Sequence, residues 1–177
     1  LDRGALYVDS GDEGAASSVV IESALAEIRD VGTQFEVRIL EDAVRVRVRE
    51  GTVLLRSERR EAAVSPSMEA VLGGDGALTM RSFPSCGPEW SWGLAAAPTF
   101  RLEGSTAGAF LRWAARETGL ELRWAAPGLK EVAEGMTLHG DIRGVSPDEA
   151  PKVVLPTCGL ASTIVDGTVL LIEYTAR

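Results

Sequence analysis

Few side chains in this sequence could carry out chemistry. Its 177 residues include one histidine, His139, and two cysteines, Cys86 and Cys158. A catalytic site needs a base, a nucleophile or a metal placed together, and neither cysteine has a cysteine or histidine at metal-ligand spacing. His139 falls between Leu138 and Gly140 in a predicted strand, where an exposed or hydrogen-bonded histidine is the ordinary case. We therefore expect no enzyme activity, no metal and no cofactor.

Two further patterns fall short of a catalytic site. The glycine-rich run 73–76 lacks the strand, helix and Lys-Ser/Thr context of a phosphate-binding loop. The carboxylates of Asp9 and Asp30 could pair in space, but their spacing gives no reason for it. The two cysteines allow a disulfide in an oxidising compartment, which sequence alone does not decide. The simpler interpretation makes Cys158 a small buried hydrophobic residue.

The most concentrated charge lies on one predicted strand. In residues 43–49 valine alternates with arginine, so successive side chains point to opposite faces. The valines form the buried face, and Arg45, Arg47 and Arg49 form the other. Three guanidinium groups in a row could bind an acidic partner. The alternative is a solvated face whose charge is balanced by nearby carboxylates. These would be Glu36, Glu50 and Glu58.

Composition and charge narrow the function classes. The formal net charge of -8 removes the usual basis of nucleic-acid binding, which is clustered Lys and Arg. With 45% hydrophobic and 25% charged residues the chain is an ordinary folded protein. No stretch approaches the ~20 consecutive apolar residues of a membrane-spanning helix, and no basic-then-apolar segment opens the chain. We expect any membrane anchor or export signal to lie upstream.

The first half of the chain is predicted to be all-β. From residue 4 to 81 apolar residues recur mainly with period two, and Gly, Asp and Ser separate the runs. Turns are expected at 41–42, 50–51 and 73–76. The expected strands are 5–9, 18–22, 34–39, 43–49, 52–55, 62–64, 68–72 and 77–80. So many short strands without an amphipathic helix predict a sandwich or a strongly curved, β-helix-like sheet.

A linker is predicted over 84–98, where the pattern lapses into Pro, Gly and Ala. It separates a β-domain over 1–83 from a domain over 99–177 that mixes helices and strands, so the whole chain is expected to be α+β. Trp90 and Trp92 lie within the linker. We expect them to pack the connection against one of the domains rather than to form an exposed ligand-binding pair.

The second domain is predicted to be a repeated βαβ unit. A strand over 100–102 leads into a helix that Ser105 caps and Gly119 ends, and the next strand begins at Leu120. The order strand, helix, strand then repeats, followed by one more strand. The echo of residues 118–120 in residues 158–160 supports an internal duplication.

The second repeat has a marked helix start. After a strand over 138–142, Ser146 is the expected N-cap, Pro147 the first helical residue, and Glu149 lies three residues after the cap. Pro151 falls inside this helix, where it removes a hydrogen bond. We therefore expect a short or bent helix.

The last strand is the second candidate for partner binding. Gly159 ends the second helix, and a strand from Leu160 turns at 166–167 into the final apolar run. This run is apolar enough to form an exposed sheet edge to which a partner adds a strand. The alternative is a central core strand. Its residues are Val169, Leu170, Leu171 and Ile172.

Three blocks of the first half resemble the FecR domain. They are 4–11 (GALYVDSG), 28–37 (IRDVGTQFEV) and 46–53 (VRVREGTV), of which the middle block is the most specific. Its Gly32 and Thr33 are expected to form a tight bend that returns Phe35 and Val37 to the core.

Residues 100–173 are similar to the short N-terminal domain shared by secretins and TonB-dependent transporters. The matching blocks are 110–120 (FLRWAARETGL) and 144–150 (GVSPDEA). Pro151 departs from the leucine usual at that place. FecR-like proteins often carry such a domain at the C-terminus, so the two resemblances agree with each other.

The resemblance implies cell-surface signalling. FecR-like proteins usually sit in the inner membrane with this part in the periplasm. They sense an outer-membrane TonB-dependent transporter, often one for iron-siderophore complexes, and regulate a cytoplasmic sigma factor. The expected partner is the transporter's periplasmic signalling domain, with no nucleic acid and no membrane contact beyond an N-terminal anchor. The alternatives are an envelope scaffold, which could self-associate, and a glycan-binding module.

Overall fold

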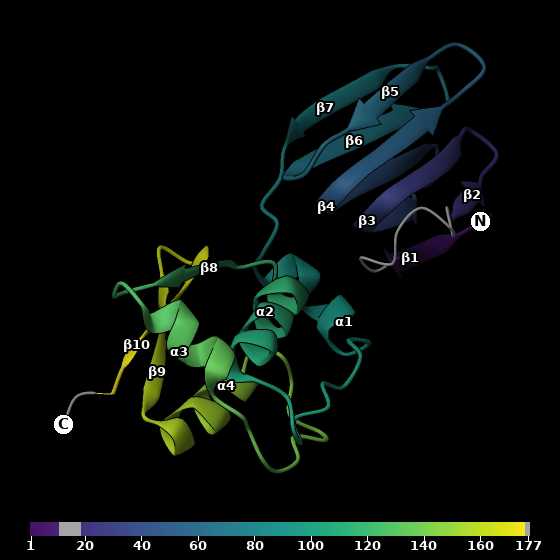
Figure 1. The fold of residues 1–177 in the computed structure, drawn as a ribbon. Coiled ribbons are helices and arrows are strands. Elements are labelled where there is room, and N and C mark those ends of the chain that lie inside the picture. Colours follow the sequence, from purple (N-terminus) through teal and green to yellow (C-terminus); the bar gives the residue numbers. More distant parts are fainter. Residues whose placement is uncertain (11–18, 176–177) are drawn as a thin grey trace. The chain divides into compact units, whose positions relative to one another are not determined.

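The chain forms two compact units, Leu1–Ser85 and Cys86–Arg177, in a computed structural model that describes residues 1–10 and 19–175. The first unit is β-rich, and the second combines a small sheet with short helices (Figure 1). This confirms the predicted α+β class with a β-rich N-terminal part. In the described residues, no helix is both long and apolar enough to cross a membrane.

The first unit is one seven-stranded sheet built around two long strands. Its strands are β1 (Gly4–Asp9), β2 (Val20–Glu22), β3 (Glu27–Ile39), β4 (Ala43–Arg56), β5 (Glu61–Val64), β6 (Met68–Gly73) and β7 (Leu78–Ser82). β3 and β4 form the central hairpin. β1 and β2 pair with β3, β5 and β6 pair with β4, and β7 pairs with β6, all antiparallel. All the remaining strands of the unit except β7 therefore pair directly with the long hairpin.

The alternating valines of β4 build the core of the first unit, as predicted. Val44, Val46 and Val48 are at most 1% exposed, and Phe35 and Val37 of β3 belong to the same core. No helix occurs among the described residues of this unit. A sheet face this apolar must be shielded from water, so the sheet bends round and covers its own apolar face.

Two hydrogen bonds show how strongly the sheet bends. A straight strand as long as β4, with 14 residues, would span about 45 Å. Yet one loop, between β6 and β7, reaches both ends of β4. Before the strand, the Gly74 N–H donates to the Asp42 carbonyl oxygen at 2.9 Å. After it, Arg59 Nη1 donates to the Asp75 carbonyl oxygen at 3.4 Å. β4 thus folds back across the core.

The turn predicted at 50–51 is wrong, because β4 runs through these residues without a break. Gly51 has a φ of 76°, and a Cβ there would overlap the Gly32 carbonyl oxygen. The register of β3 against β4 shifts at the same level, between residues 31 and 35. This paired bulge moves the buried face from even to odd residue numbers, which keeps Val53 in the core.

The second unit packs helices on one face of a three-stranded sheet. Its helices are α1 (Ser91–Leu94), α2 (Ala107–Thr118), α3 (Leu129–Gly135) and α4 (Ala150–Val154), with 3₁₀ turns at Pro88–Trp90 and Leu155–Cys158. Its strands are β8 (Glu121–Trp124), β9 (Leu160–Val165) and β10 (Val169–Tyr174). α1 and the first 3₁₀ turn lie in the predicted linker, where Trp90 is buried and Trp92 is exposed.

α2 ends as the sequence predicts and begins one residue later. Thr106, not Ser105, is the N-cap, since its side-chain oxygen accepts the Ala109 N–H at 3.1 Å. Gly119 ends the helix in the left-handed conformation, with φ 71°. The apolar face that includes Phe110 is buried in the core.

The predicted start of the second helix is wrong, but its shortness is confirmed. α4 begins at Ala150, whose N–H donates to the Ser146 carbonyl oxygen in a turn that precedes the helix. Pro151 therefore falls in the first turn, where no partner for its missing N–H is needed. Gly159 ends the following 3₁₀ turn with φ 74°.

The strands predicted over 100–102 and 138–142 are also wrong. Neither segment is a strand in the structure. Just after the first segment, the Gly104 N–H donates to the Leu138 carbonyl oxygen at 3.0 Å, and the Leu138 N–H donates to the Ser105 carbonyl oxygen at 2.8 Å. α3 was not predicted at all. Among residues 86–175, only the three strands after α2 form a regular sheet.

Candidate functional site

The outer face of the first sheet carries a row of charges across four strands. Glu36 of β3 lies opposite Arg47 of β4, Arg47 opposite Glu69 of β6, and Glu69 opposite Arg81 of β7. The signs alternate along the row, which we call the charge ladder. Directly opposed charges of opposite sign stabilise neighbouring strands, so the ladder pins the register of this half of the sheet.

The ladder's carboxylates are buried beneath its arginines. Glu69 accepts hydrogen bonds from Arg47 Nε and Arg81 Nε, each at 2.6 Å, and Glu36 accepts one from Arg45 Nη2 at 2.8 Å. The side chains of both glutamates are only 1% exposed, whereas that of Arg81 is 66% exposed. The arginines cover the carboxylates with their apolar stems and keep a path to water at the rim.

Arg45, Arg47 and Arg49 of β4 form the arginine stripe, and further contacts of Arg47 and Arg49 reach the chain after β7 and Tyr7 of β1. The Arg47 guanidinium stacks 3.8 Å from the centre of the Phe83 ring. Arg49 is buried, with Nε donating to the Ser85 carbonyl oxygen at 2.8 Å and Nη1 to the Tyr7 hydroxyl at 3.2 Å. These bonds join the sheet face to the segment that ends the first unit.

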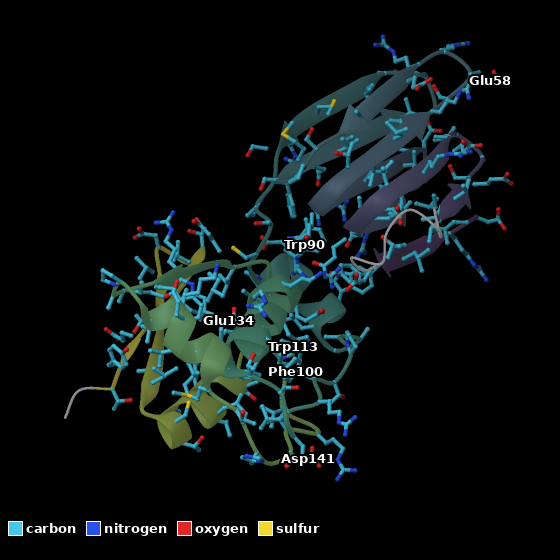
Figure 2. All side chains as sticks on the ribbon, in the orientation of Figure 1. Glu58, Trp90, Phe100, Trp113, Glu134 and Asp141 are labelled. Atoms are coloured by element: carbon cyan, nitrogen blue, oxygen red, sulfur yellow. The ribbon has the colours of Figure 1, made fainter. Side chains whose placement is uncertain are left out.

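The stripe is less solvated than the solvated-face alternative supposed, and Glu69, which was not predicted, supplies part of the balancing charge. Of the three predicted counter-charges, Glu36 pairs with the stripe and Glu58 is exposed at a loop (Figure 2). Glu50 is exposed as well. Glu69, the most central acid of the ladder, was missed because only strand pairing brings it opposite Arg47. Partner binding by Arg45, Arg47 and Arg49 stays a prediction.

Burial and ion pairing act in opposite directions on the ladder's glutamates. Burial by itself raises the pKa of the Glu69 carboxyl, but hydrogen bonds from Arg81 and Arg47 more than offset it. Burial also raises the pKa of Glu36, but the hydrogen bonds from Arg45 and Arg38 lower it by more than burial raises it. Both carboxyls thus have a pKa below the ordinary value and are held ionised.

These pKa shifts make the stability of the first unit depend on pH. A glutamate in the unfolded chain has a pKa of about 4.3, and the two ladder glutamates have a lower pKa in the folded protein. Their stabilisation is therefore complete above about pH 4.3 and is lost as the pH falls through the folded pKa. We expect a Glu36→Gln/Glu69→Gln double variant to be less stable at neutral pH but to lose less stability on acidification. The test is the urea midpoint of unfolding of the variant and of the unmodified chain, measured at several pH values from neutral to acid. If the two midpoints fall in parallel as the pH is lowered, the prediction is wrong.

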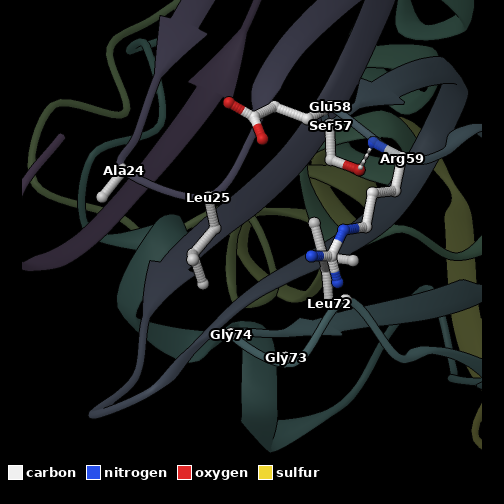
Figure 3. Close-up of a pocket in the computed structure, with 9 residues that line it drawn as sticks. Ala24, Leu25, Ser57, Glu58, Arg59, Leu72, Gly73 and Gly74 are labelled. Carbon is white, nitrogen blue, oxygen red and sulfur yellow. Dashed lines mark hydrogen bonds between the residues drawn. The ribbon is translucent and has the colours of Figure 1, made fainter.

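A hollow in the first unit is lined by residues from three loops, between β2 and β3, between β4 and β5, and between β6 and β7 (Figure 3). Arg59 and Glu58 are its charged side chains, and the Ser57 hydroxyl accepts the Arg59 N–H at 3.4 Å. The other lining residues are Ala24, Leu25, Leu72, Gly73, Gly74 and Gly76. This lining contains neither a nucleophile beside a base nor an aromatic ring on which a sugar could stack. It gives no support to catalysis or to glycan binding at this place.

The edge strand predicted at the C-terminus is wrong. β10 pairs with β8 on one side, in parallel, and with β9 on the other, antiparallel, so it is the central strand (Figure 1). Both backbone edges of Val169, Leu170, Leu171 and Ile172 are thus taken, and the alternative of a central core strand holds. The open edges of this sheet are β8 and β9.

The aromatic cluster of the second unit is structural. Phe100 and Trp113 lie side by side (Figure 2), with ring centres 5.4 Å apart. Phe110 packs against both rings. The Trp113 indole N–H donates to the Pro98 carbonyl oxygen at 3.1 Å. The cluster anchors the chain that leads into α2 on the helix itself.

His139 takes part in a surface contact. Its Nδ1 lies 2.9 Å from Glu103 Oε1, and Glu103 Oε2 also accepts the Gly140 N–H at 2.8 Å, all at exposed positions. The hydrogen bond from His139 and that from Gly140 lower the pKa of Glu103. Across residues 1–10 and 19–175, no group of three or more His, Cys, Asp or Glu side chains could hold a metal ion.

Both cysteines are free thiols. Cys86 is buried, with Sγ 3.3 Å from the Gly167 carbonyl oxygen, and Cys158 is partly buried, with Sγ 3.2 Å from that of Leu155. Burial raises the pKa of the Cys158 thiol, which keeps it protonated and unreactive at neutral pH.

Comparison with known proteins gives structural neighbours only. No protein-family model matches the sequence, and no curated protein matches it. Two crystal structures of a protein from Parabacteroides distasonis, provisionally described as an anti-sigma factor, are similar to this chain at 13% sequence identity and a TM-score of 0.43. The similarity covers 98% of this chain and 78% or 79% of the other.

Proposed function

We propose that this chain is the periplasmic sensing region of a FecR-like signalling protein that regulates a sigma factor. In this proposal it binds the periplasmic signalling domain of an outer-membrane TonB-dependent transporter, in iron-siderophore uptake. The full-length protein is held at the inner membrane of a Gram-negative bacterium. The chain acts by binding a protein and not by catalysis.

The open sheet edge of the second unit carries the proposal. A small sheet whose outermost strand has unpaired backbone groups is a ready template for a strand of another protein. The sequence blocks that resemble the FecR domain and the secretin/TonB short domain support the signalling context. Glu36 and Glu69 of the first unit are held in internal ion pairs, which leaves neither carboxylate free to act as a catalytic base.

Calorimetric titration tests the proposal. The chain 1–177 is titrated with isolated periplasmic signalling domains of TonB-dependent transporters from the same organism. One-to-one binding with a Kd on the order of micromolar is expected. Absence of heat with every such domain, while circular dichroism shows a folded chain, would favour the envelope scaffold instead. Recovery of the full-length protein in the cytosol on fractionation would refute the periplasmic address.

A further inference from the structure

The backbone of β9 is open on the side away from β10. Gly159, just before β9, lies opposite Thr175 and accepts its N–H at 3.0 Å. Hydrogen-bonded and non-bonded pairs alternate along an antiparallel ladder. From Gly159 onward, the backbone N–H and C=O groups of every second residue therefore point toward β10. Those of Ser162 and Ile164, which lie between, point away from β10. Among the described residues no strand pairs with this side.

Nothing on β9 protects this edge. Natural sheets usually shield an edge strand with charges, proline or a bulge, but β9 reads Leu-Ala-Ser-Thr-Ile-Val and pairs with β10 without a register shift. The other edge strand, β8, carries Glu121 and Arg123, joined by an ion pair at 2.8 Å. Of the two edges, β9 is the one suited to accept a strand.

An apolar hollow adjoins the open edge. Ser162 and Ile164 line it from β9, and Ile164 is 49% exposed although it lies on the helix-covered face of the sheet. Asp148 and Lys152 are its charged residues. The remaining lining is Ala114, Thr118, Leu120, Pro147, Pro151 and Leu170. Covering a half-exposed isoleucine and an adjoining apolar hollow with a partner's side chain removes apolar surface from water, which favours binding.

We propose that β9 receives an extended strand of the partner protein, which pairs with the backbone of Ser162 and Ile164 and places one aliphatic side chain in this hollow. The inference deepens the proposed function, on which the choice of partner rests. Strands in a sheet lie about 4.8 Å apart, so an added strand covers Ile164. Its alternate side chains face the hollow and the open surface in turn, which gives one position of strong apolar preference.

Three substitutions at one residue separate the parts of this proposal. Ser162→Pro removes the N–H that faces the partner and leaves the bonds to β10 intact. Ser162→Leu keeps that N–H and fills the hollow, and Ser162→Ala keeps the N–H with the hollow open. We expect the affinity for the transporter signalling domain to fall about tenfold or more with proline and about fivefold with leucine, and to stay within about twofold with alanine. Circular dichroism of each variant confirms the fold.

A peptide arm keeps the inference testable without the transporter. The probe is an alternating threonine–valine peptide with a central leucine and lysines at both ends, titrated into isotopically labelled chain 1–177. Amide shifts at Ser162 and Ile164 that vanish when the central leucine is replaced by aspartate would support the inference. If the peptide binds there and no signalling domain does, the proposed function fails and the edge site stands.

Three results would overturn the inference. The first is a Ser162→Pro variant that binds the signalling domain as tightly as the unmodified chain, which leaves the proposed function standing. The second is the absence of amide shifts in β9 at millimolar peptide, or shifts confined to β8. The third is a dimer in sedimentation velocity that Ser162→Pro converts to monomer, since the edge would then pair with a second copy of this chain.

Discussion

Replacing Phe110 by alanine is expected to lower the free energy of unfolding of the second unit by about 4 kcal/mol. The side chain is completely buried, and its ring packs 5.7 Å from that of Phe100 and 5.9 Å from that of Trp113. Removing it leaves a cavity that the surrounding helices cannot close. Unfolding in urea, followed by tryptophan fluorescence, measures the loss, because all four tryptophans lie in the second unit.

Val153→Ala is the matched control for Phe110→Ala. Val153 also lies on a helix of the second unit, but it is 55% exposed. Its truncation should change the free energy of unfolding by less than about 0.5 kcal/mol. A Phe110→Ala loss as small as that of the control would mean that the aromatic cluster does not form the core described above.

Replacing Glu69 by alanine is expected to lower the free energy of unfolding of the first unit by about 3 kcal/mol. The substitution leaves Arg47 without its closest carboxylate on a face where that side chain is largely covered. We take the lower end of the range for buried pairs, because Arg81 opens the ladder to solvent. Hydrogen exchange at the amides of Val46 and Val48 reports on this part of the sheet.

Glu61→Ala is the control for Glu69→Ala. Glu61 pairs with Arg56 across two strands of the same sheet, but both side chains are more than 60% exposed. An exposed pair of this kind contributes at most about 1 kcal/mol. If Glu69→Ala proves no more destabilising than Glu61→Ala, the ladder is a surface feature without structural weight.

The short-range parts of the fold could be predicted from the sequence. The valines of 43–49 were assigned correctly to the core, because alternation along a strand depends on local geometry alone. The left-handed ends at Gly119 and Gly159 were likewise predicted from residue type. Gly51 was misread as a turn, since a glycine in a turn and a glycine in a bulge look alike in sequence.

The candidate sites depended on pairings that sequence does not contain. Glu69 became the centre of the charge ladder only because β6 aligns with β4 in one register. The apolar run 169–172 was a reasonable edge strand by composition, yet the sheet placed it centrally and left the less apolar β9 outside.

By itself, then, the sequence determined that residues 43–49 alternate, which face of that strand is apolar, and that Gly119 and Gly159 end their helical segments. The tertiary structure decided which strands are neighbours, which acid meets which arginine and which backbone edge stays open. The physical reason is the range of the interactions. Periodicity and capping act within a few residues, whereas strand order and register follow from packing residues far apart in the chain around a shared core.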